Sequence, residues 1–357
     1  MDKGLGFVAI ILIWGGALYL FSGTLLRQSG RLGGDGFLAS TLANFEEVFN
    51  TKKDIIGVFG ADGDYEKSTV YFDKSVNIRG INVAPGNSNL VFAPSDDGLL
   101  VSNDGGSDWR IFSDAEHKIN SGADVYKIVF APDGNAYMSI FKNNQGILYR
   151  SRDNFLTVEK LFGMEGQAIY DFDLSGDEIY LGLSDGRIFI YSIAENSSRI
   201  VFSLPRAITG LKTGKQNMNL IYASVKEGGF YASENKGESF QRMKYLDKYR
   251  GASQINDFVV SPSNDYLVYA ATDYGFIRSS DGGKTWQVFD SLPSEEREIS
   301  SVYYDSASSK IYVSSNGKLY INGNGGLNWQ ILETGIGDRS ISAIAPNNGK
   351  IIIGTSD

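Results

Sequence analysis

The chain has 357 residues and a formal net charge of −9, with one histidine and no cysteine. The absence of cysteine excludes disulfides, thiolate nucleophiles and Cys-bound metals, and the lone His117 excludes a His-based catalytic triad or a His-rich metal site. The acidic balance disfavours a nucleic-acid-binding surface, which usually shows as a basic excess.

The N-terminal segment 4–26 contains no charged residue and is mostly apolar. It is long enough to cross a bilayer as a helix, so we predict a retained single-pass membrane anchor. A cleaved signal peptide and a buried core helix are the alternatives, and no A-x-A-like cleavage site follows the apolar run. Lys3 precedes the segment, while Arg27 and Arg31 follow it, and this small charge bias taken alone would place the rest of the chain in the cytoplasm.

Residues 27–35 are rich in glycine and polar groups and are interpreted as a flexible linker. The sequence Gly-Phe-Leu-Ala-Ser at 36–40 closely repeats Gly-Phe-Tyr-Ala-Ser at 229–233. We therefore expect residues 36–49 to form a β-hairpin. An amphipathic helix is the alternative, because apolar residues also recur there at helical spacing.

Residues 50–78 are interpreted as an insertion before the first complete repeat. Apolar runs at 55–59 and 69–72 predict an extra hairpin around the acidic turn at 62–64. This turn could bind Ca²⁺, but it lacks EF-hand spacing, and a plain turn is favoured. A long insertion on a rigid scaffold is often functional, and a solvated excursion is the equal alternative.

Six repeats of four short apolar runs follow, at 79–112, 125–162, 169–204, 207–246, 255–289 and 299–332. All but the third contain a polar turn between the third and fourth runs, and its clearest copy is Ser279-x-Asp281-x-Gly283-x-Thr285-Trp286. Asp281 can accept hydrogen bonds from N–H groups of the turn, Gly283 can take a positive φ, and Trp286 offers a large apolar face. We call these turns the box turns. The corresponding residues of the other four turns are Ser102, Asp104, Gly106 and Trp109 in the first repeat, Ser151 and Asp153 in the second, Ser233, Asn235, Gly237 and Phe240 in the fourth, and Asn324, Gly326 and Trp329 in the sixth.

The C-terminal residues 341–345 and 350–354 supply only two further runs before the chain ends. A period of about 40 to 50 residues with four strands in each unit is typical of a β-propeller. The two runs and the N-terminal hairpin together complete one more repeat. This predicts an all-β, seven-bladed β-propeller over residues 36–357, closed by both termini and preceded by one transmembrane helix. We expect 351–354 to pair with 37–40, which would leave no free sheet edge where the ring closes.

The box turns resemble the Asp-box, or BNR repeat, of sialidase-like β-propellers, a family that includes sialidases, sortilin-type receptor domains and the photosystem II assembly-factor type. The resemblance covers roughly residues 34–357 and is strongest from Ser279 to Trp286. It implies that the boxes are structural staples on the outer hairpin of each blade, away from the ligand-binding face. It also implies an extracytoplasmic propeller, because anchored members of the family generally lie outside the cytoplasm.

The catalytic signature of a sialidase is incomplete in this sequence. The resemblance would require an arginine cluster, a Tyr–Glu nucleophile pair and a Phe/Tyr-Arg-Ile-Pro stretch, and the nearest match is Asn-Ile-Arg-Gly at 77–80. Carboxylates at 96–97, at 171 and 173, and at 295–296 are interpreted as solvated turns or strand faces, and the box tryptophans as blade packing. We therefore predict no enzymatic activity, no cofactor and no metal site. A glycan-binding protein or a sialidase-like glycoside hydrolase at the cell surface is the alternative.

The candidate binding surface is a connection that contains Lys244, Tyr245, Lys248, Tyr249 and Arg250. A cationic, aromatic segment is unusual in this acidic chain, and Tyr and Arg are favoured in interface hot spots; a solvated loop is the alternative. Such connections lie on the face of a propeller where partners usually dock. We predict a membrane-anchored, extracytoplasmic, non-catalytic interaction or assembly scaffold that binds a protein partner at the membrane.

Overall fold

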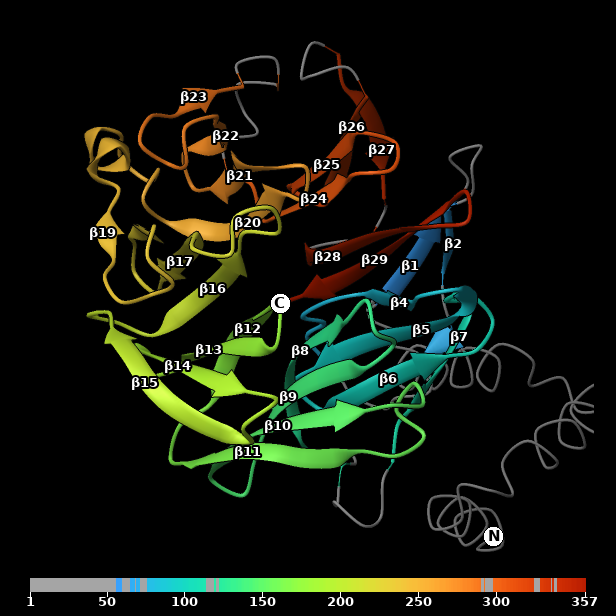
Figure 1. Cartoon of the computed structure of the whole chain (residues 1–357). Helices are drawn as coiled ribbons and strands as arrows, with labels where there is room; N and C mark the ends of the chain where they lie inside the picture. The colour runs from blue at the N-terminus through green and yellow to red at the C-terminus, as the bar shows by residue number, and fades with distance from the viewer. Residues whose placement is uncertain are drawn as a thin grey trace, which may run out of the picture. The chain divides into compact units, whose positions relative to one another are not determined.

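The computed structural model describes the chain at 56–59, 65–67, 69–70, 76–113, 119, 122–289, 292, 298–323, 328–334, 336 and 339–357. Within these residues the strands form seven sheets, which are arranged as blades around a central axis (Figure 1). Six of the sheets have four strands and one has five. The prediction of an all-β, seven-bladed propeller is confirmed.

The four strands of each blade follow one another outward from the axis. The inner strands of blades 1 to 7 are β4 (Asn82–Ala84), β8 (Asp124–Phe130), β12 (Ile169–Ser175), β16 (Ile208–Thr213), β20 (Ile255–Ser261), β24 (Ser301–Asp305) and β28 (Ser340–Asn347). The second strands are β5 (Asn87–Ser95), β9 (Ala136–Lys142), β13 (Glu178–Leu183), β17 (Ile221–Val225), β21 (Asn264–Thr272), β25 (Lys310–Ser315) and β29 (Lys350–Ser356). The third strands are β6 (Gly98–Ser102), β10 (Gln145–Ser151), β14 (Arg187–Ser192), β18 (Phe230–Ser233), β22 (Gly275–Ser279), β26 (Lys318–Asn322) and β1 (Ile56–Phe59). The outer strands are β7 (Asp108–Ile111), β11 (Glu159–Glu165), β15 (Ser197–Ser203), β19 (Gln241–Arg242), β23 (Gln287–Val288), β27 (Gln330–Glu333) and β2 (Tyr65–Lys67).

The antiparallel order of these strands gives the ring two distinct faces. The inner strand of every blade begins on one face, the second strand returns to it, and the third strand leaves it again. We call this the top face; it carries the turns between second and third strands and the connections between blades. The opposite, bottom face carries the box turns, which join the third strand to the outer strand.

Blade 7 is built from both ends of the described chain, with the strand order β2-β1-β29-β28. β29 pairs antiparallel with β1, and Val58 lies opposite Ile352. The prediction that 351–354 pair with 37–40 was therefore wrong, and part of the predicted insertion at 50–78 belongs to this blade.

Burial explains why β1 occupies this position. A third strand is covered on both of its faces by neighbouring blades, and all of β1 is buried. The uninterrupted apolar run Ile-Gly-Val-Phe suits a strand with two buried faces. Residues 36–49 lie outside the described part of the chain.

A further short strand, β3 (Thr69–Val70), extends blade 1 outward. The expected hairpin between 55–59 and 69–72 does not form, because β1 pairs with β2 and β3 pairs with β7. The β3–β7 pairing is parallel, with Val70 opposite Trp109. The outer edge of a blade thus accommodates an additional strand in this protein.

Arg339 fastens blade 7 to blade 1. Its buried guanidinium donates to the Thr355 hydroxyl and to the Val76 carbonyl, each at 2.7 Å. Beside it, the Ile78 N–H donates to the Thr355 carbonyl at 2.9 Å. Arg339 and Val76 are 263 residues apart in the sequence, so the ring is closed by polar bonds as well as by strand pairing.

The hydrophobic core consists of seven clusters, and each lies between two neighbouring blades. A buried tyrosine recurs at one position of the second strand and packs toward the next blade in five cases: Tyr137, Tyr180, Tyr222, Tyr269 and Tyr312. The Tyr222 hydroxyl donates to the Asp265 carbonyl of blade 5 at 2.9 Å, and the Tyr180 hydroxyl donates to the Lys236 carbonyl of blade 4 at 3.3 Å. These tyrosines join neighbouring blades by packing and, in two cases, by a hydrogen bond.

The four described box turns of blades 1, 2, 4 and 5 share one hydrogen-bond network. In blade 5 the Ser279 hydroxyl donates to Asp281 at 2.8 Å, the Gly283 N–H donates to Ser279 at 2.8 Å, and the Thr285 N–H donates to Asp281 at 2.8 Å. Burial raises the pKa of Asp281, but the hydrogen bonds outweigh it and hold the pKa below its usual value. The Trp286 indole is buried and donates to the Gly283 carbonyl at 2.9 Å.

The other three turns repeat this network around Ser102, Ser151 and Ser233. In blade 2, Phe155 takes the place of the glycine with φ 64 and is itself buried. The turn of blade 6 at 324–327 lies outside the described residues.

No helix within the described residues has the length and apolar character needed to span a membrane. The segment 4–26, where a membrane anchor is predicted, lies outside this part of the chain. So do His117, the acidic turn at 62–64 and the carboxylate pair at 295–296.

Candidate functional site

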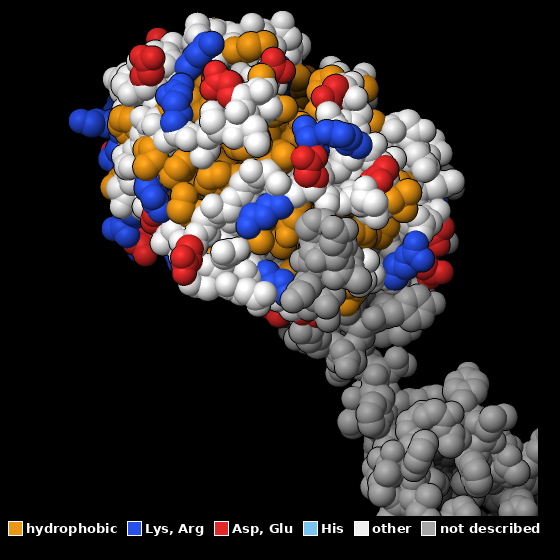
Figure 2. Space-filling model, turned by 60° about the horizontal axis from the view of Figure 1, so that its bottom comes forward, with side chains coloured by type: hydrophobic (Ala, Val, Ile, Leu, Met, Phe, Trp, Pro, Cys, Tyr) orange, Lys and Arg blue, Asp and Glu red, His pale blue; other side chains and the backbone are white. Residues whose placement is uncertain are grey.

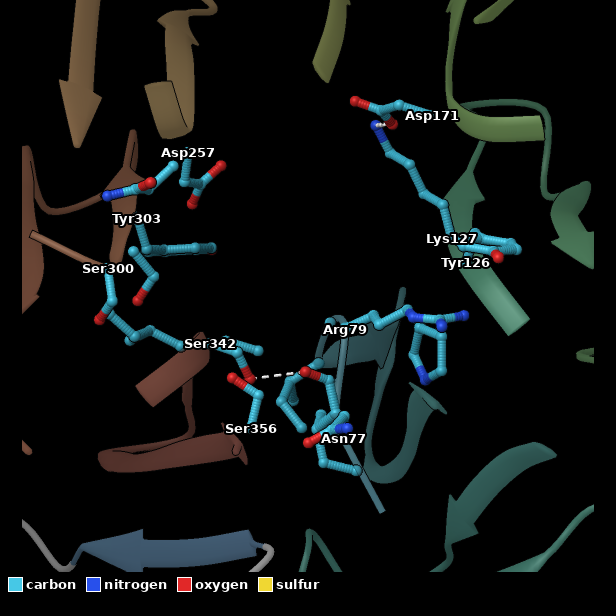
Figure 3. A pocket seen from close by; sticks show the side chains of 18 of the residues that line it. Asn77, Arg79, Tyr126, Lys127, Asp171, Asp257, Ser300, Tyr303, Ser342 and Ser356 are labelled. Atoms are coloured by element: carbon cyan, nitrogen blue, oxygen red, sulfur yellow. Dashed lines mark hydrogen bonds and ion pairs between the residues drawn. The ribbon is translucent and has the colours of Figure 1, made fainter. Parts of the chain in front are cut away.

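A cavity of about 830 Å³ lies in the middle of the ring, and all seven blades line it. Its lining residues come from the inner strands and from the top-face ends of β5 and β29, so the cavity opens on the top face. We call it the top-face funnel. Figure 3 shows Asp171, Lys127, Tyr126 and Arg79 on one side of the funnel, and Asp257, Tyr303 and the serines Ser300 and Ser342 across from them. The labelled residues are Asn77, Arg79, Tyr126, Lys127, Asp171, Asp257, Ser300, Tyr303, Ser342 and Ser356.

Asp171 is the centre of the charged side of the funnel. It forms ion pairs with Lys127 and with Lys212, the latter at 3.2 Å, and it accepts a hydrogen bond from the Leu211 N–H at 2.7 Å. Burial raises its pKa, but the two ammonium groups outweigh this, so the pKa lies below its usual value. Asp171 is therefore ionised and held by groups from blades 2 and 4.

The two lysines at Asp171 differ in their pKa values. Burial lowers the pKa of Lys127 to about 8, and the Asp171 carboxylate only partly opposes the shift. For Lys212 burial acts in the same direction, but the carboxylates of Asp171 and Asp257 outweigh it and raise the pKa above its usual value. Lys127 is thus the amine of the funnel that loses its proton most readily.

A second acidic residue of the same strand, Asp173, continues this network below the funnel. It pairs with Lys215 at 2.9 Å and accepts the Thr213 N–H at 2.8 Å. The interpretation of Asp171 and Asp173 as a solvated strand face was wrong, because both are buried against blade 4. An Asp-x-Asp pattern points both side chains to one face of a strand, and here that face meets the neighbouring blade.

Asp257 occupies the wall between Lys212 and blade 6. It accepts the Val302 N–H at 3.1 Å. Burial raises its pKa, and Lys212 only partly opposes the shift. The pKa of Asp257 is therefore raised, whereas that of Asp171 is lowered. Both carboxylates accept a hydrogen bond from a backbone N–H of the next blade.

Arg79 forms the cationic and aromatic rim of the funnel on blade 1. Its guanidinium lies 4.0 Å from the centre of the Tyr126 ring and pairs with Asp124 at 3.2 Å. The Tyr126 ring is in turn 5.0 Å from that of Tyr170. Burial raises the pKa of Tyr126 to about 12, so its hydroxyl is neutral at physiological pH.

The opposite wall includes Asp257 and is otherwise lined mainly by hydroxyl-bearing side chains. The Ser300 hydroxyl donates to the Ile341 carbonyl at 2.9 Å, and the Ser342 hydroxyl donates to the Ile78 carbonyl at 2.5 Å. Each of these bonds joins neighbouring blades. The funnel therefore combines one side with ion pairs and aromatic rings and another side where hydroxyl groups lie beside Asp257.

The predicted binding connection forms a short 3₁₀ helix, η1 (Lys244–Lys248), on the top face between blades 4 and 5. Leu246 anchors it in the core, and the Lys248 ammonium lies 4.4 Å from the centre of the Tyr245 ring. The Tyr249 ring lies 6.2 Å from that of Tyr245 and 5.3 Å from that of Tyr274, which stands at the neighbouring turn of blade 5.

The structure places the connection on the same face as the funnel but outside its lining. Lys244, Lys248, Tyr249 and Arg250 are exposed, and Tyr245 is half-buried. Sequence reasoning named these residues, assigned Asp171 to a solvated strand face, and missed the funnel residues Lys127 and Lys212. Lysines within the apolar inner strands β8 and β16 were the available signal, and they had no visible partner until the blades were assembled.

No group of three or more potential metal ligands occurs in the part of the chain that the structure describes. The charged groups of the funnel are instead joined in ion pairs and backbone hydrogen bonds. This arrangement can bind a polar or charged group by exchanging some of these contacts.

The fold and the funnel define a seven-bladed β-propeller with a polar top face. No family model matches the sequence, and no curated protein matches it. Solved structures do match. YCF48 from Cyanidioschyzon merolae has a TM-score of 0.58 at 12% identity, over 78% of this chain and 95% of that chain.

Two further structures show the same architecture. YCF48 bound to D1 peptide has a TM-score of 0.56 at 11% identity, over 79% of this chain and 94% of that one. The extracellular domain of a protein described as a hybrid two-component system from B. thetaiotaomicron has a TM-score of 0.61 at 16% identity, over 81% of this chain and 38% of that one. At these identities the likeness concerns the fold.

Proposed function

We propose that this chain is a non-catalytic interaction or assembly scaffold that binds a protein partner through its top face. The observation that carries the proposal is that the funnel opens on the same face on which the 244–250 connection lies. The first offers charged and hydroxyl groups, and the second offers exposed cations and tyrosines. A partner that covers both would contact groups suited to an interface hot spot.

The comparisons support a protein partner. One of the similar propellers is a structure with a peptide bound, YCF48 with D1 peptide. A propeller of this size can therefore hold a segment of another protein. The peptide and its position belong to that complex; for this chain we propose only the class of ligand.

The arrangement of the carboxylates supports a binding role rather than catalysis. Asp171 and Asp257 have the opposed pKa shifts that an acid–base pair needs, but both accept a hydrogen bond from the backbone of the next blade. Asp171 is also held by two lysines. We propose that these groups stabilise the inner wall of the ring.

The location of the protein is a separate part of the proposal. The uncharged segment 4–26 supports a membrane anchor, and the shared network of the box turns supports the resemblance to extracytoplasmic Asp-box propellers. We propose an anchored propeller outside the cytoplasm whose partner is associated with the same membrane. Protease protection of the propeller in sealed membrane vesicles of known orientation tests this.

The top face can be tested by charge reversal. Lys248→Glu combined with Arg250→Glu should abolish co-purification of a partner from detergent-solubilised membranes, because both cations are exposed on that face. Lys310→Glu with Lys350→Glu is the matched control, since these exposed lysines lie at bottom-face turns. Equal loss of the partner in both double variants, with both folded, would contradict the proposal. Binding to a glycan array that survives removal of all protein partners would favour the glycan alternative.

A further inference from the structure

The outer edge of blade 3 is a second surface, separate from the top face. β15 has seven residues, and all of them are exposed or partly exposed. Among the described residues no strand lies on its outer side, so one row of its backbone N–H and C=O groups has no sheet partner. We propose that the β15 edge binds an extended segment of another protein, which adds a strand to blade 3.

β15 is longer than most of the other outer strands and carries fewer charges than the one of equal length. Natural sheet edges are usually short or carry charged residues. β19 and β23 have two residues each, and β27 has four and ends in Glu333. β11 is as long as β15 but carries Glu159, Lys160 and Glu165. The only charged residue of β15 is Arg199.

The sequence of blade 3 explains why this edge is long. Blade 3 has no box turn, and a tight turn joins β14 to β15 instead. Asn196 takes a left-handed conformation there, with φ 50, and accepts a hydrogen bond from the Tyr191 hydroxyl at 2.5 Å. Pairing starts directly at the turn, with Ser192 opposite Ser197, and reaches the other end of β14, with one β-bulge at Val201. The missing motif therefore gives the blade an outer strand of seven residues.

Apolar side chains surround the edge. Ile200 is 51% exposed, and Val201 and Phe202 are partly exposed. The Phe202 ring lies 5.2 Å from that of Phe240, the box aromatic of blade 4. Figure 2 brings the lower part of Figure 1, where β11 and β15 lie, toward the viewer and shows hydrophobic side chains gathered between scattered charged ones. An added strand would bury part of this surface.

Blade 1 shows that such an addition is compatible with the fold. There β3 lies on the outer edge of β7 and makes that sheet five-stranded. The pairing is parallel and covers only two residue pairs. β15 offers a longer edge of the same kind, so a segment of about seven residues, or roughly 23 Å at 3.3 Å per residue, could pair along it.

The chemistry of the edge indicates the kind of segment that fits. Its exposed apolar side chains favour β-branched or aromatic residues in the added strand. Arg199 forms no ion pair with any described residue, so an acidic side chain at the facing position would meet an available cation. The occupant is therefore an extended, largely apolar segment with one acidic residue, from a protein other than this one.

The test uses the full-length chain and a displayed library of random twelve-residue peptides. Enriched peptides are synthesised, and their affinities are measured by fluorescence anisotropy. We expect alternating β-branched or aromatic residues with one acidic residue, and binding should slow amide hydrogen exchange at 197–203. Ile200→Lys should weaken binding about tenfold or more, because a lysine on an edge opposes pairing. Ile331→Lys is the matched control, since Ile331 is 47% exposed on the shorter strand β27, and its affinity should stay within about twofold.

A second variant keeps the test decisive if Ile200→Lys alters the fold. Arg199→Glu should shift the enriched peptides from acidic to basic residues. Failure to enrich any peptide, protection that maps to the top face, or affinity unchanged by Ile200→Lys would each overturn the proposal. Concentration-dependent dimers in light scattering that Ile200→Lys abolishes would assign the edge to a second copy of the chain and also overturn it.

Discussion

Lys127 and Asp171 show how strongly single residues of the funnel depend on one another. Burial lowers the pKa of Lys127 to about 8, and Asp171 limits the shift. Asp171→Asn removes the opposing carboxylate, so the pKa of Lys127 should fall further. NMR titration of ¹³C-methylated lysines measures this, and loss of a signal in Lys127→Gln assigns it. A pKa that stays the same or rises would contradict the coupling.

The direction of this shift also gives a pH dependence of stability. Lys127 has a pKa of about 8 in the folded protein against 10.5 for an ordinary lysine. Between these values the unfolded chain binds more protons, so the contribution of Lys127 to the free energy of unfolding rises with pH across this window. Chemical denaturation at several pH values should show this rise in the natural chain and lose it in Lys127→Gln.

Trp286 is the residue through which the contribution of a box turn to stability can be tested. Its side chain is 6% exposed, and its indole N–H is bonded to the turn. Trp286→Ala should lower the free energy of unfolding by about 3–5 kcal/mol, the range for truncation of a buried aromatic. Val288→Ala, on an exposed position of the following strand, is the control and should change it by less than about 0.5 kcal/mol. A stable Trp286→Ala variant that no longer binds its partner would make the tryptophan a ligand platform.

The residues of the box turns could be predicted because each turn is local. Ser279, Asp281 and Gly283 act on one another within five residues, and their chemistry is visible in a single window of sequence. Asp171 could not be placed in this way, because its partners Lys127 and Lys212 belong to other blades. A lone Asp on a strand has the same pattern whether water or a lysine faces it.

At the scale of elements, β1 is the strand on which blade 7 depends. It lies between β2 and β29, and all four of its residues are buried. A chain that starts at residue 54 should keep the thermal transition of the whole propeller, because 54–357 forms one compact unit. A chain that starts at residue 61 should lose it, because β29 would have no partner on its outer side. Equal melting of both shortened chains would show that β1 is dispensable.

The misplacement of this strand has a physical reason. The segment at 36–40 matches the sequence of a known third strand, and that similarity favoured it over the run at 56–59. A third strand needs only burial on both faces and a suitable length, and the Ile-Gly-Val-Phe run meets both conditions without resembling its counterparts. Sequence similarity between repeats identifies a position less reliably than its burial does.

For the molecule as a whole, Arg339 is the residue that tests ring closure. It bonds to Val76, which precedes blade 1, and to Thr355, which lies in blade 7. Arg339→Met should leave buried carbonyl and hydroxyl groups unsatisfied and lower the free energy of unfolding by about 1–3 kcal/mol for each. The loss should appear as a single shifted transition, with faster amide exchange in all blades. Loss of protection confined to blade 7 would show that the blades unfold independently.

The number of blades was predictable because a repeat with a constant period needs no knowledge of long-range contacts. Five box turns and their spacing were enough to indicate a propeller. The funnel was not predictable in the same way. Its wall takes residues from each of the seven inner strands, so it exists only once all seven strands are side by side.

The pairing of β1 with β29 has a consequence for how the chain is made. β1 leaves the ribosome early, while its partner Ile351 follows Phe59 by about 290 residues. At roughly 5–20 residues per second, synthesis of that interval takes about 15–60 s. Throughout this time the apolar strand β1 lacks its β29 partner, so its backbone N–H and C=O groups on that side can pair with neighbouring nascent chains. A chaperone that shelters the run at 56–59 until translation ends would therefore raise the yield of folded protein, and slower translation would lower it in the absence of such a chaperone.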